Sequence, residues 1–124
     1  MNPKNLKYTK DHEWIDIHGE EATVGITHFA QKELGDIVYV EVESLDEFVD
    51  SGKVFGTVEA VKTVSDLFMP ISGKVIRINQ NLIDNPELIN MDPYGKGWLI
   101  KIKISNLNEV INLLDSRSYE KITG

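Results

Sequence analysis

Short segments in which apolar and polar residues alternate run through most of this sequence and limit its fold more than any other feature. In DIVYVEVES, residues 36–44, Val38, Val40 and Val42 occupy every second position. A period of two is typical of a strand whose two faces meet different surroundings, so these valines are expected to share one face. Gly, Pro and Asp residues separate such segments, as turn residues do. The pattern predicts a mainly β fold, either a sandwich or a flattened barrel.

Other segments extend this pattern in both directions along the chain. Strands are expected in a hairpin over residues 13–27 that turns at Gly19, and over residues 53–61, 63–79 and 98–104. A C-terminal helix is predicted over residues 105–122, where apolar residues recur at helical spacing. A shorter helix is predicted over residues 27–35, with Thr27 as its cap and Gly35 as its end. One further helical turn is expected to begin at Pro86.

The length and charge of the chain limit the number of domains and the kinds of partner that it can have. The chain has 124 residues, 41% of them apolar, which suits a single domain over residues 1–124 with its own core. It has 13 basic and 20 acidic residues, a net charge of −7, which argues against nucleic acid as a partner. No segment approaches the ~20 apolar residues of a membrane span. The first 14 residues also show no signal or transit peptide, so a cytosol-like compartment is expected.

The sequence offers little chemistry of its own. With no cysteine in the chain, thiolate nucleophiles, disulfides and Cys-based zinc sites are excluded. His12, His18 and His28 have no metal-binding spacing, and no nucleotide-binding or nucleophile-elbow motif is present. We therefore expect no metal and no catalytic residues. Seven acids and no Lys or Arg lie within residues 33–50, a pattern of either a solvated face or a docking face for basic partners.

Lys62 lies in GTVEAVKTVSD, residues 56–66, among small and β-branched residues. Glu59 and Asp66 are the acids on its two sides. In an exposed hairpin, this lysine would project its amine on a flexible stem away from a rigid sheet. It is then either an ordinary surface lysine or the attachment point of a cofactor that supplies the missing chemistry. The pattern of residues leaves both interpretations open.

Five separated segments share the order and spacing of one known family. They are LKYTKDHEW, ATVGIT, AQKELGDIVYVE, GTVEAVKTVSDLFMPISGKV and PYGKGWLIKIK. Along nearly its whole length the chain resembles the glycine cleavage system H proteins, the lipoyl carriers of that complex. The resemblance implies a barrel-sandwich hybrid, the lipoyl-domain-like fold. In this fold two antiparallel sheets are accompanied by short helices and a C-terminal helix, and a hairpin bears the modified lysine.

The resemblance also implies a cofactor and partners. Lipoic acid would be joined to Lys62 through an amide that removes the lysine's charge. The partners would be glycine decarboxylase (P protein), aminomethyltransferase (T protein), dihydrolipoyl dehydrogenase (L protein) and the lipoylating enzymes. The chain would be a monomeric carrier, not an enzyme. It would act in a bacterial cytoplasm, or in the mitochondrial matrix if it is a processed eukaryotic chain.

Four acidic positions acquire roles from the same resemblance. Glu13 and Asp66 match acids that contact the amine of the loaded lipoyl arm in a surface cleft. Asp11 stands where relatives often have a small hydroxyl residue, and that position lines the cleft as well. Glu59 belongs to the motif around the modified lysine and is expected to help lipoylating enzymes recognise the hairpin.

Three alternative functions remain beside this one. An H-like protein could relay lipoate to other lipoyl-dependent complexes. A biotin carrier domain is a further alternative, although such domains usually flank their lysine with methionines, whereas Val61 and Thr63 flank Lys62. The last is a β interaction module in which Lys62 stays unmodified.

Overall fold

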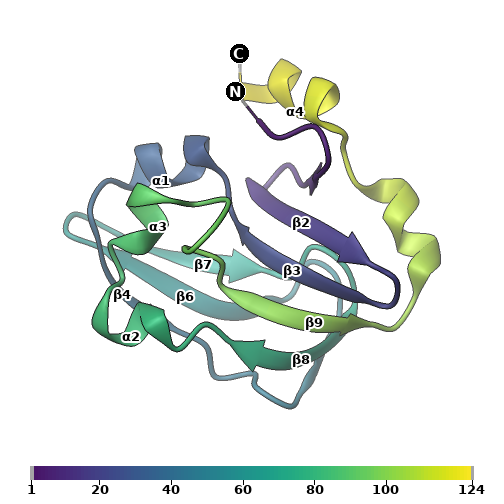
Figure 1. The fold of residues 1–124 in the computed structure, drawn as a ribbon, viewed down its shortest axis with the longest axis horizontal. Coiled ribbons are helices and arrows are strands. Elements are labelled where there is room, and N and C mark those ends of the chain that lie inside the picture. The colour runs from purple at the N-terminus through teal and green to yellow at the C-terminus, as the bar shows by residue number, and fades with distance from the viewer. Residues whose placement is uncertain (1, 124) are drawn as a thin grey trace.

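The computed structural model describes residues 2–123 and contains two antiparallel sheets (Figure 1). The larger sheet has the order β1-β2-β3-β9-β8-β5, and the smaller has the order β4-β6-β7. The strands are β1 (Lys7–Tyr8), β2 (Glu13–His18), β3 (Glu21–Ile26), β4 (Ile37–Glu41), β5 (Phe48–Val49), β6 (Val54–Ala60), β7 (Val64–Phe68), β8 (Gly73–Ile78) and β9 (Ile100–Ile104). Buried apolar residues from both sheets, including Ile15 and Val58, form one core. The predicted mainly β fold is confirmed.

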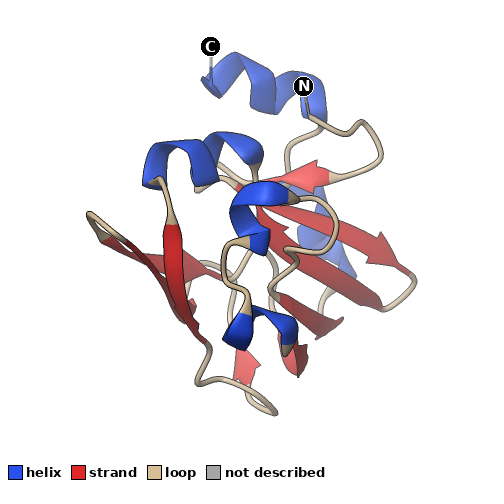
Figure 2. Ribbon diagram, turned by 60° about the vertical axis from the view of Figure 1, so that its left-hand side comes forward, coloured by secondary structure: helices blue, strands red, loops and turns tan. Residues whose placement is uncertain are grey.

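Three of the helices lie in connections between strands and two follow the last strand, and all of them lie outside the sheets (Figure 2). They are α1 (His28–Leu34), α2 (Asn81–Asp84), α3 (Leu88–Met91), the 3₁₀ helix η1 (Leu107–Asn112) and α4 (Ser116–Thr123). The predicted ends of α1 are confirmed, because the Thr27 side chain accepts a hydrogen bond from the Ala30 N–H and Gly35 adopts a φ of 82°. None of the helices in residues 2–123 is long and apolar enough to cross a membrane.

The prediction of one continuous helix over residues 105–122 is wrong for the middle of this segment. Two shorter helices, η1 and α4, occupy this region instead. Between them Leu114 pairs with Tyr8, and each N–H donates to the other residue's carbonyl oxygen at 2.8 Å. An extended residue held in a bridge cannot continue a helix, so a partner about 100 positions away overrides the local pattern.

The predicted face of Val38 is also different in the structure. A register shift interrupts the pairing of β4 with β6 between Ile37 and Tyr39. Ile37 is buried, whereas Val38 is 47% exposed. A bulge adds one residue to its strand, so the alternation that places Val38 with Val40 changes face at this point.

Gly25 lies inside β3, the second strand of the hairpin predicted over residues 13–27. It pairs with Trp14, and a Cβ at Gly25 would lie 2.6 Å from the indole ring. The indole is fixed by burial and by its N–H, which donates to the Pro93 carbonyl at 2.9 Å. We expect Gly25→Ala to lower the free energy of unfolding by about 1–3 kcal/mol through overpacking, measured by chemical denaturation. An unchanged free energy of unfolding would show that the indole has room to move.

Candidate functional site

Lys62 lies at the tip of the β6–β7 hairpin and is exposed. The last strand pair is Glu59 with Val64, and the Ala60 N–H donates to the Thr63 carbonyl at 2.7 Å. The hairpin therefore places Lys62 at the end of a hydrogen-bonded ladder, and Figure 1 shows the two strands β6 and β7 that form it. Its stem lies over the end of α1, because a Cβ at Gly35 would be 3.1 Å from the Lys62 Cε. The side chain as a whole is nevertheless exposed to solvent.

A cleft of about 220 Å³ lies between α1, β7 and the loop before β2. Its floor is apolar, with Phe29 and Leu67 among the lining residues. Its polar lining includes four carboxylates, those of Asp11, Glu13, Glu33 and Asp66. Among residues 2–123, no Lys or Arg lines it. Such a cleft favours a small cationic group that has an apolar stem.

Three of the acids named from the sequence thus line one cleft, although they come from different elements. Asp11 and Glu13 lie in or beside the start of β2, and Asp66 lies in β7. Contact of these acids with a lipoyl arm stays a prediction. Glu59 is not among the lining residues; it is exposed on β6, between Tyr39 of β4 and Val64 of β7.

Glu13 is the most buried carboxylate of the cleft, with 2% of its surface exposed. Its two oxygens accept hydrogen bonds from the Thr9 hydroxyl at 2.8 Å and from the Phe68 N–H at 3.3 Å. Burial raises the pKa of Glu13 to about 8, against the partial compensation of these two bonds. A buried acid of this kind gains from a cation that enters the cleft, because the cation stabilises its charged form.

The raised pKa of Glu13 makes stability depend on pH. Between the ordinary pKa of 4.5 and about 8, the folded state binds more protons than the unfolded state. The free energy of unfolding should therefore fall, by a few kcal/mol at most, as pH rises through this window. Glu13→Gln should remove this fall and be more stable than the native protein near pH 8.5, as thermal unfolding at several pH values would show. Parallel pH profiles for the two proteins would contradict the raised pKa.

The structure adds residues to the cleft that sequence reasoning missed. Glu33 was counted only in the acidic segment, and His12 only as a histidine without metal-binding spacing. Both line the cleft. Two signals could have found them: Glu33 follows Phe29 by four positions on α1, which places both on one helix face, and His12 stands between two of the named acids. Within residues 2–123, no group of His, Asp and Glu side chains is arranged to hold a metal ion.

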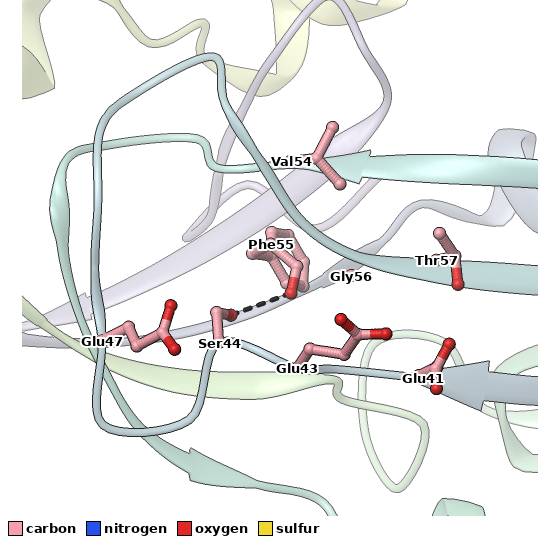
Figure 3. Close-up of a pocket in the computed structure, with 8 residues that line it drawn as sticks. All are labelled: Glu41, Glu43, Ser44, Glu47, Val54, Phe55, Gly56 and Thr57. Carbon is pink, nitrogen blue, oxygen red and sulfur yellow. Dashed lines mark hydrogen bonds between the residues drawn. The ribbon is translucent and has the colours of Figure 1, made fainter.

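The fold distributes acids of the segment over residues 33–50 between two different hollows. Glu41, Glu43 and Glu47 line a second hollow of about 340 Å³, in which the Ser44 hydroxyl donates to the Phe55 carbonyl at 2.8 Å (Figure 3). This hollow shares no lining residue with the cleft. The glutamates of the second hollow are therefore useful controls for charge changes made in the cleft.

Comparison with known proteins gives these features a context. The family model described as glycine cleavage H-protein matches residues 6–124. The chain belongs to this family. It is 52% identical over 122 residues to the glycine cleavage system H protein of Bacteroides fragilis, covering 98% of this chain and 97% of that one. Its identity to the H protein of Carboxydothermus hydrogenoformans is 51% over 120 residues, covering 97% and 92%.

A solved structure of an H-protein family member supports the fold as well. The crystal structure of the glycine cleavage system H protein from Mycobacterium marinum superposes with a TM-score of 0.87 at 39% sequence identity. The match covers 99% of each chain. The barrel-sandwich hybrid expected from the resemblance is therefore the fold of this chain.

Proposed function

We propose that this chain, as one domain over residues 1–124, is the lipoyl carrier of a glycine cleavage system. Lipoic acid would be attached by an amide to the Nζ of Lys62. When bound, it supplies the sulfur chemistry that receives the aminomethyl group of glycine and passes it on. The observation that carries the proposal is an exposed lysine at a hairpin tip, with its stem over the end of a helix that lines an acidic cleft, in a chain of the H-protein family.

The cleft residues have a defined task under this proposal. Glu13, Asp66 and Asp11 would accept hydrogen bonds from the protonated amine of the aminomethyl cargo. The apolar floor would keep water away from the methylene carbon, whose hydrolysis releases formaldehyde and ammonia. The chain itself would hold and shield the cargo and catalyse no step.

The partners follow from the same role. Glycine decarboxylase would supply the cargo, aminomethyltransferase would remove it, and dihydrolipoyl dehydrogenase would reoxidise the lipoyl group. Lipoylating enzymes would modify Lys62. We place this monomeric carrier in a bacterial cytoplasm, in keeping with its relatives from Bacteroides and Carboxydothermus.

Intact-mass measurement of the protein purified from its native source, with peptide mapping, tests this function against the alternatives. We expect one lipoyl increment on the peptide that contains Lys62. A biotin increment there would support a biotin carrier, and an unmodified Lys62 in cells that make lipoate would support an interaction module. Either result would refute the proposal. A lipoylated chain that glycine decarboxylase cannot load would instead be a relay of lipoate.

Glu59 gives a separate prediction about attachment. It is exposed on β6, three positions before Lys62, so a lipoylating enzyme that binds the tip would meet its carboxylate. We expect Glu59→Gln to slow lipoylation in vitro several-fold without changing the fold. Glu41→Gln is the control, because it makes the same charge change on an exposed residue of the same sheet. Equal lipoylation rates for the two variants would remove Glu59 from this role.

A further inference from the structure

A buried hydroxyl connects the C-terminal helix to the cleft. Tyr119 of α4 is fully buried, and its ring stacks on Tyr8 with centroids 4.8 Å apart. Its Oη lies 2.7 Å from the Nδ1 of His12 and 2.7 Å from the Oγ1 of Thr27. Figure 1 shows α4 lying over the N-terminal part of the chain, and α4 contacts β1. His12 lines the cleft, so Tyr119 connects α4 to the cleft wall through this hydrogen bond and through an edge-on contact of the two rings, whose centroids are 5.6 Å apart.

Only one assignment of the protons among Thr27, Tyr119 and His12 gives each of the two buried hydroxyls an acceptor. Thr27 is fully buried, and its oxygen already accepts from the Ala30 N–H. Among the hydrogen bonds of residues 2–123, the Thr27 hydroxyl has one acceptor, the Tyr119 oxygen. A buried hydroxyl without an acceptor is costly, so Thr27 donates to Tyr119 and Tyr119 donates to the Nδ1 of His12. The proton of the neutral His12 ring is then on Nε2.

The His12 ring is also held in place from its other sides. The His12 main chain has a φ of 69°. Its backbone N–H donates to the Thr9 carbonyl at 3.1 Å, and its backbone carbonyl accepts from the Thr27 N–H at 3.0 Å. The ring packs on Phe29 with centroids 4.7 Å apart. In residues 2–123, every buried side-chain nitrogen has a hydrogen-bond partner. The Nε2 of His12 has no such partner, so it is not buried and is accessible.

Charged neighbours act on His12 from two elements. Asp11 of the same loop and Glu33 of α1 both favour the imidazolium, whereas burial lowers the pKa of His12 and is the larger effect. A cationic His12 would pair with these two carboxylates. It would thereby oppose a cationic cargo that needs the same negative charge.

We propose that Tyr119 is a positioning residue of the cleft, which holds His12 as a neutral imidazole with its proton on Nε2. In this state His12 adds no positive charge to the carboxylates of the cleft. The benefit to an ammonium cargo rests on the proposed function. The assignment of the protons does not, because it follows from the buried hydroxyls alone.

Nitrogen NMR of the protein labelled with ¹⁵N-histidine, with Lys62 unmodified, tests the proton assignment directly. At pH 7.5 we expect an unprotonated Nδ1 and a protonated Nε2 for His12. Tyr119→Phe keeps the stacked ring and should give a mixture of tautomers. Tyr8→Phe is the matched control: it removes the other hydroxyl of the stack, which donates to the Pro3 carbonyl, and should keep the native signature. A protonated Nδ1 in the native protein, no change in Tyr119→Phe, or an equal change in Tyr8→Phe would overturn the proposal.

A double-mutant cycle tests the effect on the cargo. After lipoylation and loading, Tyr119→Phe should release formaldehyde several-fold faster than the native carrier, whereas Tyr8→Phe should not. His12→Asn tolerates the left-handed backbone and cannot carry charge. If Tyr119 acts through His12, adding Tyr119→Phe to His12→Asn should change the release rate no further. Additive effects would overturn the positioning role. A chain that accepts no lipoate would refute the proposed function and leave the NMR result to decide on Tyr119.

Discussion

Arginine at position 62 is expected to abolish lipoyl attachment and, with it, all glycine–bicarbonate exchange in a reconstituted glycine cleavage system. Amide formation needs an amine that can lose a proton and attack an activated lipoyl carbonyl. The guanidinium of arginine is permanently protonated and cannot do so. Residue 62 is exposed at a hairpin tip, and the similar stem of arginine can lie over Gly35 at the end of α1 as the lysine stem does. The unfolding midpoint should therefore stay unchanged.

Lys53→Arg is the control for this experiment. Lys53 is also exposed and lies outside both the hairpin tip and the cleft. The Lys53→Arg variant should be lipoylated at Lys62 and should support glycine–bicarbonate exchange at the native rate. Lipoate-dependent exchange that persists in Lys62→Arg would refute the assignment of Lys62 as the carrier residue.

The second large effect is expected at Glu13. Replacing it with glutamine keeps the size of the side chain and its capacity to bond Thr9 and the Phe68 N–H, but removes the charge. A hydrogen bond to a charged group contributes about 1.5–3 kcal/mol, so the loaded carrier should release formaldehyde about tenfold to a hundredfold faster. The rate can be followed with a formaldehyde-trapping reagent.

The control for Glu13 is Glu43→Gln, in the second hollow of Figure 3. It makes the same substitution of glutamate by glutamine outside the cleft and should release formaldehyde at the native rate. Because Glu13→Gln is also expected to be more stable at high pH, a faster release could not be ascribed to loss of folding. Native release from Glu13→Gln would remove this residue from the protective role.

How far the sequence predicts the fold depends on the range of the interactions involved. Thr27 and Gly35 were placed correctly because the ends of a short helix depend on neighbouring residues. The β4 bulge and the break near Leu114 were not predicted, because each depends on a strand or residue that is distant in sequence. A local pattern of residues does not show which distant residues will pair with it.

The candidate site followed a similar division. The hairpin and its lysine were visible in the sequence, but the residues alone did not distinguish attachment from exposure. The roles expected of Glu13 and Asp66 came from the family resemblance. Glu33, His12 and Tyr119 could be connected to the cleft only when the fold had brought α1, the loop before β2 and α4 together.

A single loading reaction with labelled glycine tests the central claim most directly. The lipoylated protein would be incubated with glycine decarboxylase and glycine labelled with ¹³C at its methylene carbon, and its peptides would then be mapped by mass. We predict that the label appears on the lipoyl group of the peptide containing Lys62, and on no other peptide. Label on a different residue, or a lipoylated Lys62 that acquires none, would contradict the account.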